Sequence, residues 1–100
     1  MAKQKTAVII GGTSGIGLAI SQGFATEKYQ IVIAGRNHER GILAAQACMN
    51  NGAPAAEFIS CDVADPVSVD ALALTVLQQF GTPQILVNSA GILQSGQYVL

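Results

Sequence analysis

The chain has 100 residues and a formal charge of −1, with five Lys and Arg against six Asp and Glu. Half of its residues are apolar and 11% are charged, a composition that excludes intrinsic disorder. The near-neutral charge leaves no basic surface for nucleic acid or an anionic membrane, so neither is expected as a partner. Because a chain this short buries only about two-thirds of its unfolded surface, we expect apolar surface to remain exposed after folding.

The predicted elements alternate between strand and helix from the first residues to the last. Apolar, β-branched runs at 6–10, 30–34 and 85–87 are typical of buried parallel strands, and 56–60 is a weaker strand candidate. Three stretches of helical period lie between them. In chain order they begin near Gly15, after an N-cap at Asn37, and at the Asp65-Pro66 pair.

Each predicted helix carries apolar residues at helical spacing, which we expect to face a sheet. The expected stripes are Ile16, Ala19, Ile20, Gly23 and Phe24 in the first helix, Ile42, Ala45, Cys48 and Met49 in the second, and Val69, Leu72, Ala73, Val76, Leu77 and Phe80 in the third.

The order β-α-β-α-β-α-β predicts an α/β fold, a parallel sheet with helices on both faces. Right-handed crossovers make a Rossmann-like doubly wound sheet of strand order 3-2-1-4 the simplest topology. In that order the fourth strand is an exposed edge, and the face that carries only the third helix is partly bare. We therefore expect a homo-oligomer that forms through this edge strand and this apolar face.

The N-terminus and the cysteines indicate a cytoplasmic protein. The apolar run 7–10 ends at two glycines and is too short for a signal peptide or a membrane span. Cys48 and Cys61 have neither CxxC spacing nor accompanying His residues. We interpret both as small buried hydrophobic residues in a reducing compartment.

A glycine-rich segment, Gly-Gly-Thr-Ser-Gly-Ile-Gly at 11–17, lies between the first strand and the first helix. Glycine permits a sharp turn there and a close approach of a ligand to the backbone. The following helix directs its unpaired N–H groups and positive dipole end at the same place, which favours a pyrophosphate. The spacing G-x-x-x-G-x-G, without a following Lys, is not that of a P-loop. The alternative is a tight turn without a ligand, but the position between strand and helix favours a dinucleotide site.

Three motifs in this order resemble those of the short-chain dehydrogenases/reductases. Gly11, Gly15 and Gly17 match the family's T-G-x-x-x-G-x-G, with Ile10 in place of Thr. The segment 61–63, Cys-Asp-Val, is similar to the family's Asp-Val pair, and 88–91, Asn-Ser-Ala-Gly, is similar to N-N-A-G with Ser for the second Asn. The resemblance covers essentially all of residues 1–100. It implies the N-terminal, NAD(P)-binding part of a Rossmann domain, incomplete relative to the family.

The end of the second strand bears on the choice of dinucleotide. NAD-binding domains usually place an acidic residue there for the ribose hydroxyls, whereas this chain has Gly35 followed by Arg36. A guanidinium without a carboxylate suits a 2′-phosphate, so NADP(H) is the expected cofactor and NAD(H) the alternative. The resemblance implies that the Thr13 and Ser14 hydroxyls lie near the same phosphate. Otherwise Arg36 is a solvated charge that pairs with Glu39.

Other candidate residues keep two interpretations each. By the resemblance Asp62 contacts the adenine amino group; its alternative is a local turn hydrogen bond. Asn88 either binds the cofactor's ribose or hydrogen-bonds the sheet backbone. His38 stands alone and is expected to be structurally neutral, and no metal site is predicted. The predicted cofactor-binding residues are Gly11, Thr13, Ser14, Gly15, Ile16, Gly17, Arg36, Asp62, Val63, Asn88, Ala90 and Gly91.

No catalytic residue is predicted. The family uses a Ser and a Tyr-x-x-x-Lys pair, in which a nearby ammonium lowers the pKa of the phenol that exchanges a proton with the substrate. Ile33 lies four residues after Tyr29, and the sequence stops two residues after Tyr98, so neither tyrosine has the required Lys.

The resemblance therefore implies the cofactor-binding half of an NADP(H)-dependent oxidoreductase for carbonyl or alcohol substrates, inactive alone. We expect a fragment of a longer enzyme or a truncated product that associates. One alternative is a non-catalytic nucleotide-binding or assembly module. Another, a methyltransferase-like domain for S-adenosylmethionine, is disfavoured by Gly35-Arg36.

Overall fold

A computed structural model describes residues 4–89 of the chain, and all seven predicted elements are present in it. The second and fourth strands each extend one residue beyond the predicted ends, to Gly35 and Asn88. The elements are β1 (Thr6–Ile10), α1 (Gly15–Thr26), β2 (Gln30–Gly35), α2 (His38–Asn50), β3 (Ala56–Ser60), α3 (Pro66–Phe80) and β4 (Ile85–Asn88).

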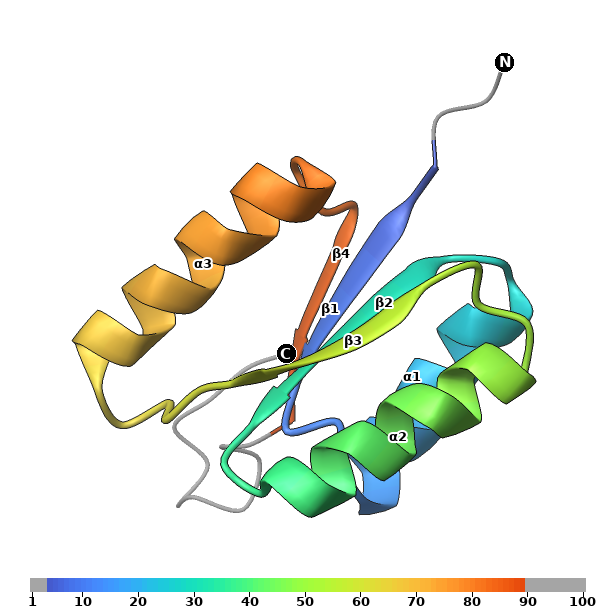
Figure 1. Cartoon of the computed structure of the whole chain (residues 1–100), viewed down its shortest axis with the longest axis horizontal. Helices are drawn as coiled ribbons and strands as arrows, with labels where there is room; N and C mark the ends of the chain where they lie inside the picture. The colour runs from blue at the N-terminus through green and yellow to red at the C-terminus, as the bar shows by residue number, and fades with distance from the viewer. Residues whose placement is uncertain (1–3, 90–100) are drawn as a thin grey trace.

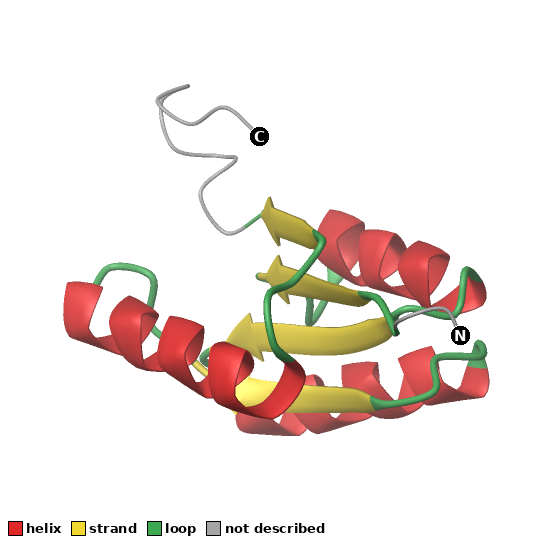
Figure 2. Ribbon diagram, turned by 90° about the horizontal axis from the view of Figure 1, so that it is seen from above, coloured by secondary structure: helices red, strands yellow, loops and turns green. Residues whose placement is uncertain are grey.

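The four strands form one parallel sheet in the order β3-β2-β1-β4. Helices α1 and α2 cover one face, and α3 lies on the other (Figures 1 and 2). The chain first moves outward from β1 to β2 and β3, and then crosses to β4 on the far side of β1. Right-handed crossovers in opposite directions put helices on opposite faces. The predicted Rossmann-like order 3-2-1-4 is confirmed.

Strand β1 is fully buried because its side chains serve two cores. Ala7 and Ile9 belong to a cluster under α1 and α2, whereas Val8 and Ile10 belong to a second cluster on the α3 side. Successive side chains of a strand point to opposite faces, so a central strand covered on both sides must be apolar throughout. Burial on both faces of β1 explains why residues 7–10 are all apolar.

The face of α1 that packs on the sheet differs in part from the predicted one. Ile20 and Phe24 of the predicted stripe do pack against the core. Ile16, expected in the buried stripe, is 65% exposed, whereas Gly17, Ser21 and Ala25 are buried. A side chain at Gly17 would overlap the carbonyl oxygen of Gly11, so the helix lies very close to β1 at this point. The Ser21 hydroxyl donates to the Gly17 carbonyl oxygen at 2.8 Å, which satisfies it despite its burial. The residues that face β1 are those small enough to let α1 approach it closely, rather than the most hydrophobic ones.

The buried face of α2 is shifted in the same way. Ile42 and Met49 of the predicted stripe are exposed, while Ala45 and Cys48 are buried as expected. Gly41 joins them because the Phe58 ring of β3 lies directly against its Cα. Burial raises the pKa of the Cys48 thiol and keeps it neutral, in line with its interpretation as a small core residue.

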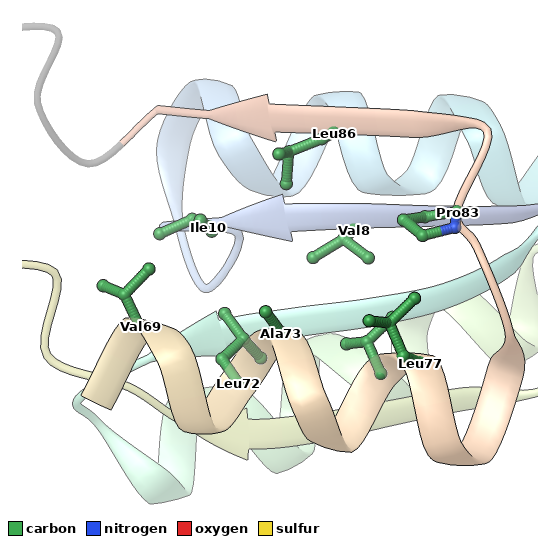
Figure 3. Close-up of a pocket in the computed structure, with 9 residues that line it drawn as sticks. Val8, Ile10, Val69, Leu72, Ala73, Leu77, Pro83 and Leu86 are labelled. Carbon is green, nitrogen blue, oxygen red and sulfur yellow. The ribbon is translucent and has the colours of Figure 1, made fainter. Parts of the chain in front are cut away.

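The predicted face of α3 does point at the sheet, but it leaves a gap. Leu72 and Val76 are buried against β1 and β2, whereas Leu77 and Leu86 remain more than half exposed. Between α3, β1 and the edge strand β4 lies an apolar groove of about 210 Å³ (Figure 3). Its lining residues are Val8, Ile10, Val69, Leu72, Ala73, Val76, Leu77, Pro83 and Leu86.

The contact of α1 with β1 predicts opposite effects for one substitution at two sites in α1. We expect Gly17→Ala to lower the free energy of unfolding by about 3 kcal/mol or more, because backbone must move to admit the methyl group. Gly23→Ala, where nothing lies within 4 Å of the added Cβ, should raise it by about 0.5–1 kcal/mol through helix propensity. Urea unfolding followed by circular dichroism measures both. Equal stability of the two variants would contradict the close approach.

Candidate functional site

A cavity of about 300 Å³ opens at the carboxyl ends of β1, β2 and β3. Ligands of doubly wound sheets bind in the crevice outside these strand ends. The cavity brings together the glycine-rich turn, the Gly35-Arg36 pair and the start of the loop after β3. Its lining residues are Ile10, Gly11, Thr13, Gly35, Arg36, Cys61, Asp62, Val63 and Ala64.

The glycine-rich turn needs glycine at particular positions. Gly11 has a φ of +83° and Gly15 a φ of +57°, values in the left-handed region that side chains disfavour. The Gly11 N–H donates to the Ala34 carbonyl oxygen at 2.7 Å, which fixes the turn to the end of β2. The glycines therefore set the path of the chain out of β1, as the motif predicted.

The N-terminus of α1 is the one most available to a ligand among the three helices of residues 4–89. Asn37 caps α2 by accepting from the Arg40 N–H, and Asp65 caps α3 by accepting from the Val67 N–H. Ser14, the N-cap of α1, makes no such bond, and the first turn of α1 holds no acidic residue. The first-turn N–H groups and the positive dipole end of α1 are thus left for an external acceptor.

Arg36 follows β2 directly and lines the cavity with Thr13. Within residues 4–89 the structure contains no ion pair between Arg36 and Glu39, the pairing that the alternative interpretation required. Gly35 leaves open space beside Thr13, since a Cβ there would reach only ordinary contact, 3.4 Å from the Thr13 methyl. The guanidinium is therefore the only charged group that β2 brings to this wall, within the part of the chain described.

Asp62 lines the same cavity as Arg36 and also makes the local turn bond. One carboxylate oxygen, Oδ1, accepts from the Ala64 N–H at 3.0 Å. The backbone N–H of Asp62 donates to the Ser68 hydroxyl of α3 at 2.9 Å. The turn bond uses one of the two carboxylate oxygens, so it is compatible with a ligand contact through the other.

The remaining predicted residues lie around the cavity rather than in its wall. Ser14, Gly15 and Ile16 are exposed at the start of α1, and Gly17 is buried against the turn. Asn88 ends β4 opposite Ile10 and is half-buried. The predicted Ala90 and Gly91 lie outside the described residues.

Two features of the site were not predicted. Cys61, interpreted only as a core residue, is buried and also contributes to the cavity wall. Ser89 follows β4, and its hydroxyl lies 3.0 Å from the carbonyl oxygens of both Ile10 and Gly11. Nothing in the local sequence around residue 89 indicates that it reaches a turn 78 residues away; only the order of the strands does.

Two further features, a metal site and a membrane-spanning helix, are absent from residues 4–89. Residues 4–89 contain no group of three or more His, Cys, Asp or Glu side chains that could hold a metal ion. None of the helices in this range is long and apolar enough to cross a membrane.

Comparison with known proteins agrees with this geometry. The sequence profile of the short chain dehydrogenase family matches residues 5–99. The chain belongs to this family. The match takes in all three motifs at the carboxyl ends of β1, β3 and β4.

Individual relatives show the extent of the likeness. L-sorbose reductase from Gluconobacter frateurii, solved with NADPH and L-sorbose, is 43% identical with a TM-score of 0.83, over 89% of this chain and 34% of that one. A 3β-hydroxysteroid dehydrogenase from Mediterraneibacter gnavus is 36% identical over 96% of this chain and 34% of its own. An NADP-dependent (R)-specific alcohol dehydrogenase from Lentilactobacillus kefiri is 38% identical over 93% and 36%. The chain therefore spans about a third of the length of these family members.

Substitution can separate the contribution of the Asp62 turn bond to stability from that of the carboxylate charge. We expect Asp62→Ala to lower the free energy of unfolding by about 1 kcal/mol, because the Ala64 N–H loses its acceptor. Asp62→Asn keeps an acceptor oxygen in place and should stay within about 0.5 kcal/mol of the wild type. Chemical denaturation measures both, and equal losses would show that the carboxylate charge, not the turn bond, stabilises this loop.

Proposed function

We propose that residues 1–100 form an NADP(H)-binding domain, the cofactor-binding part of an oxidoreductase that acts on a carbonyl or alcohol. The observation that carries this proposal is one cavity lined by the glycine turn, by Arg36 and by Asp62-Val63. Family membership supports the class of reaction. The two free buried cysteines support a reducing, cytoplasmic compartment.

The residues fit a dinucleotide with a 2′-phosphate. The uncapped N-terminus of α1 supplies N–H donors for the pyrophosphate. Arg36 would hold the 2′-phosphate, with the hydroxyl of Thr13 beside it in the same cavity. Ser14, at the N-cap of α1, would offer a second hydroxyl donor. A free oxygen of Asp62 would accept from the adenine amino group, and Asn88 would lie toward the ribose. The relatives with NADPH and NADP in their names support NADP(H) over NAD(H).

Bound NADPH supplies a hydride to the carbonyl carbon of a substrate, and the chain's part is to hold the cofactor for that transfer. The proton for the substrate oxygen needs an acid such as the family's Tyr of the Tyr-x-x-x-Lys pair. The 100 residues contain no such pair. We therefore propose that this chain binds the cofactor and does not turn it over alone.

Arginine substitution tests the cofactor assignment. We expect Arg36→Ala to weaken NADPH binding about tenfold to a hundredfold, from the loss of a charge-assisted bond to the 2′-phosphate. NADH binding should hardly change. Fluorescence titration of the reduced nicotinamide measures both affinities. Arg40→Ala, four residues along and outside the cavity lining, is the matched control and should bind NADPH as the wild type does. Equal losses of NADPH and NADH with Arg36→Ala would reject the assignment.

We also propose that the chain forms a homo-oligomer through β4 and the groove beside α3. Leu86 of β4 is 66% exposed and lines this groove. Among residues 4–89 no strand pairs with the outer edge of β4, and an unpaired edge beside an apolar surface favours association.

Charge on β4 should disrupt that association. We expect Leu86→Lys to raise the dissociation constant of the oligomer about tenfold or more, because burial of one Leu contributes about 1.5–3 kcal/mol. Leu43→Lys, at a side chain 65% exposed on α2 across the sheet, is the control and should associate normally. Light scattering over a concentration series measures both. A wild-type chain that stays monomeric at high concentration would contradict the proposal.

A further inference from the structure

Ser89 connects the end of β4 to the glycine turn. Its backbone N–H donates to the Ile10 carbonyl oxygen at 2.9 Å, which continues the sheet ladder one residue beyond β4. Its hydroxyl then lies 3.0 Å from that oxygen and 3.0 Å from the Gly11 carbonyl oxygen. One hydroxyl hydrogen serves both acceptors, either shared or in turn. Ser89 is half-buried, so water competes only partly for these carbonyls.

The Gly11 carbonyl oxygen is enclosed on a second side by Gly17. A Cβ at residue 17 would overlap this oxygen and would lie 2.6 Å from the Ser89 hydroxyl. The N–H of Gly11 is meanwhile bound to Ala34 at the end of β2. The Gly11 residue is thus held from β2 through its N–H and from β4 through its carbonyl, with Gly17 allowing α1 to close over it.

This arrangement fixes the orientation of the peptide between Gly11 and Gly12. In a trans peptide the carbonyl and the next N–H point in opposite directions. With the carbonyl held toward Ser89, the Gly12 N–H is turned away from β4. Glycines at both positions impose little barrier to rotation of this peptide, so its orientation depends on the hydrogen bonds that it makes. Rotation would release the Gly11 carbonyl oxygen from Ser89. A carbonyl oxygen that was free to turn toward a phosphate bound at this turn would repel it.

We propose that Ser89 is a positioning residue for the cofactor's pyrophosphate: its hydroxyl holds the Gly11–Gly12 peptide in the orientation that an anion accepts. This inference rests on the proposed NADP(H) site. It gives the hydroxyl at residue 89 a function in binding, through the glycine turn, without contact between Ser89 and the cofactor. The motif at 88–91, at the end of β4, would thereby stabilise the glycine-rich turn at 11–17.

The test compares two ligands in the 100-residue chain. NADPH carries the pyrophosphate, whereas adenosine 2′-monophosphate carries the adenine, the ribose and the 2′-phosphate alone. We expect Ser89→Ala to weaken NADPH binding about five- to tenfold and to leave the monophosphate within about twofold. A merely structural loss of folded protein would weaken both ligands alike. Fluorescence titration measures NADPH, and chemical-shift titration measures the weaker monophosphate.

Ser21→Ala is the matched control. Its hydroxyl is also buried and also donates to a carbonyl oxygen near the turn, that of Gly17, but the bond stays within α1. This variant should lose stability and keep both affinities. If Ser89→Ala does not fold, Ser89→Cys, with its weak S–H donor, takes its place in the same comparison.

The outcomes separate the two proposals. Unchanged NADPH affinity in the Ser89 variant, or equal weakening of both ligands, overturns the role of Ser89 and leaves the NADP(H) site standing. Failure of the wild-type chain to bind either ligand overturns the NADP(H) site itself. A selective loss for NADPH supports both.

Discussion

The close approach of α1 to the end of β1 is the constraint on which the site depends. Gly11 turns with a positive φ, and Gly17 brings the helix against the Gly11 carbonyl oxygen. A larger side chain at residue 17 would move the helix N-terminus away from the strand end. This contact, made without side chains, holds the N-terminal end of α1, with its dipole and N–H groups, beside the turn that lines the cavity.

The electrostatics of the cavity depend on the absence of carboxylates at the end of β2 and in the first turn of α1. Gly35 contributes no carboxylate at the end of β2, and the first turn of α1 has none either. Arg36 and the N-terminal end of the α1 dipole have the same positive sign. Asp62 lines the same cavity as Arg36, with one carboxylate oxygen already held by the Ala64 N–H. The cavity therefore combines a cation, which suits an anion, with a second carboxylate oxygen, which suits a hydrogen-bond donor.

Local patterns predicted the elements, whereas contacts distant in sequence determined the details. Strand runs, the N-caps at Asn37 and Asp65 and the order of the sheet were predicted because each depends on a few neighbouring residues or on the alternation itself. The buried faces of α1 and α2 were predicted only in part. Ala45 and Cys48 are buried as predicted, but Gly17 and Gly41 pack by lacking side chains, and a hydrophobic pattern cannot represent that. The glycine turn and Arg36 were predicted from residue chemistry and position, whereas the roles of Thr13, Ser14 and Asp62 come from a family resemblance; all of these roles stay predictions. The bond from Ser89 to Gly11 required the fold, because it joins residues 78 apart.

The apolar groove beside α3 and the cavity at the glycine turn are coupled through β4 and the residue that follows it, Ser89. On one side β4 has an edge that no strand within residues 4–89 pairs with, and the exposed Leu86 lies beside the groove. Directly after β4, Ser89 holds the Gly11 carbonyl oxygen. Edge strands open more readily than central ones, so any surface that covers β4 stabilises the position of Ser89 and with it the glycine turn. By linkage, a ligand that needs the ordered turn must in return favour the covered edge. Cofactor affinity and association are therefore expected to rise together, although the cavity and the groove share only Ile10.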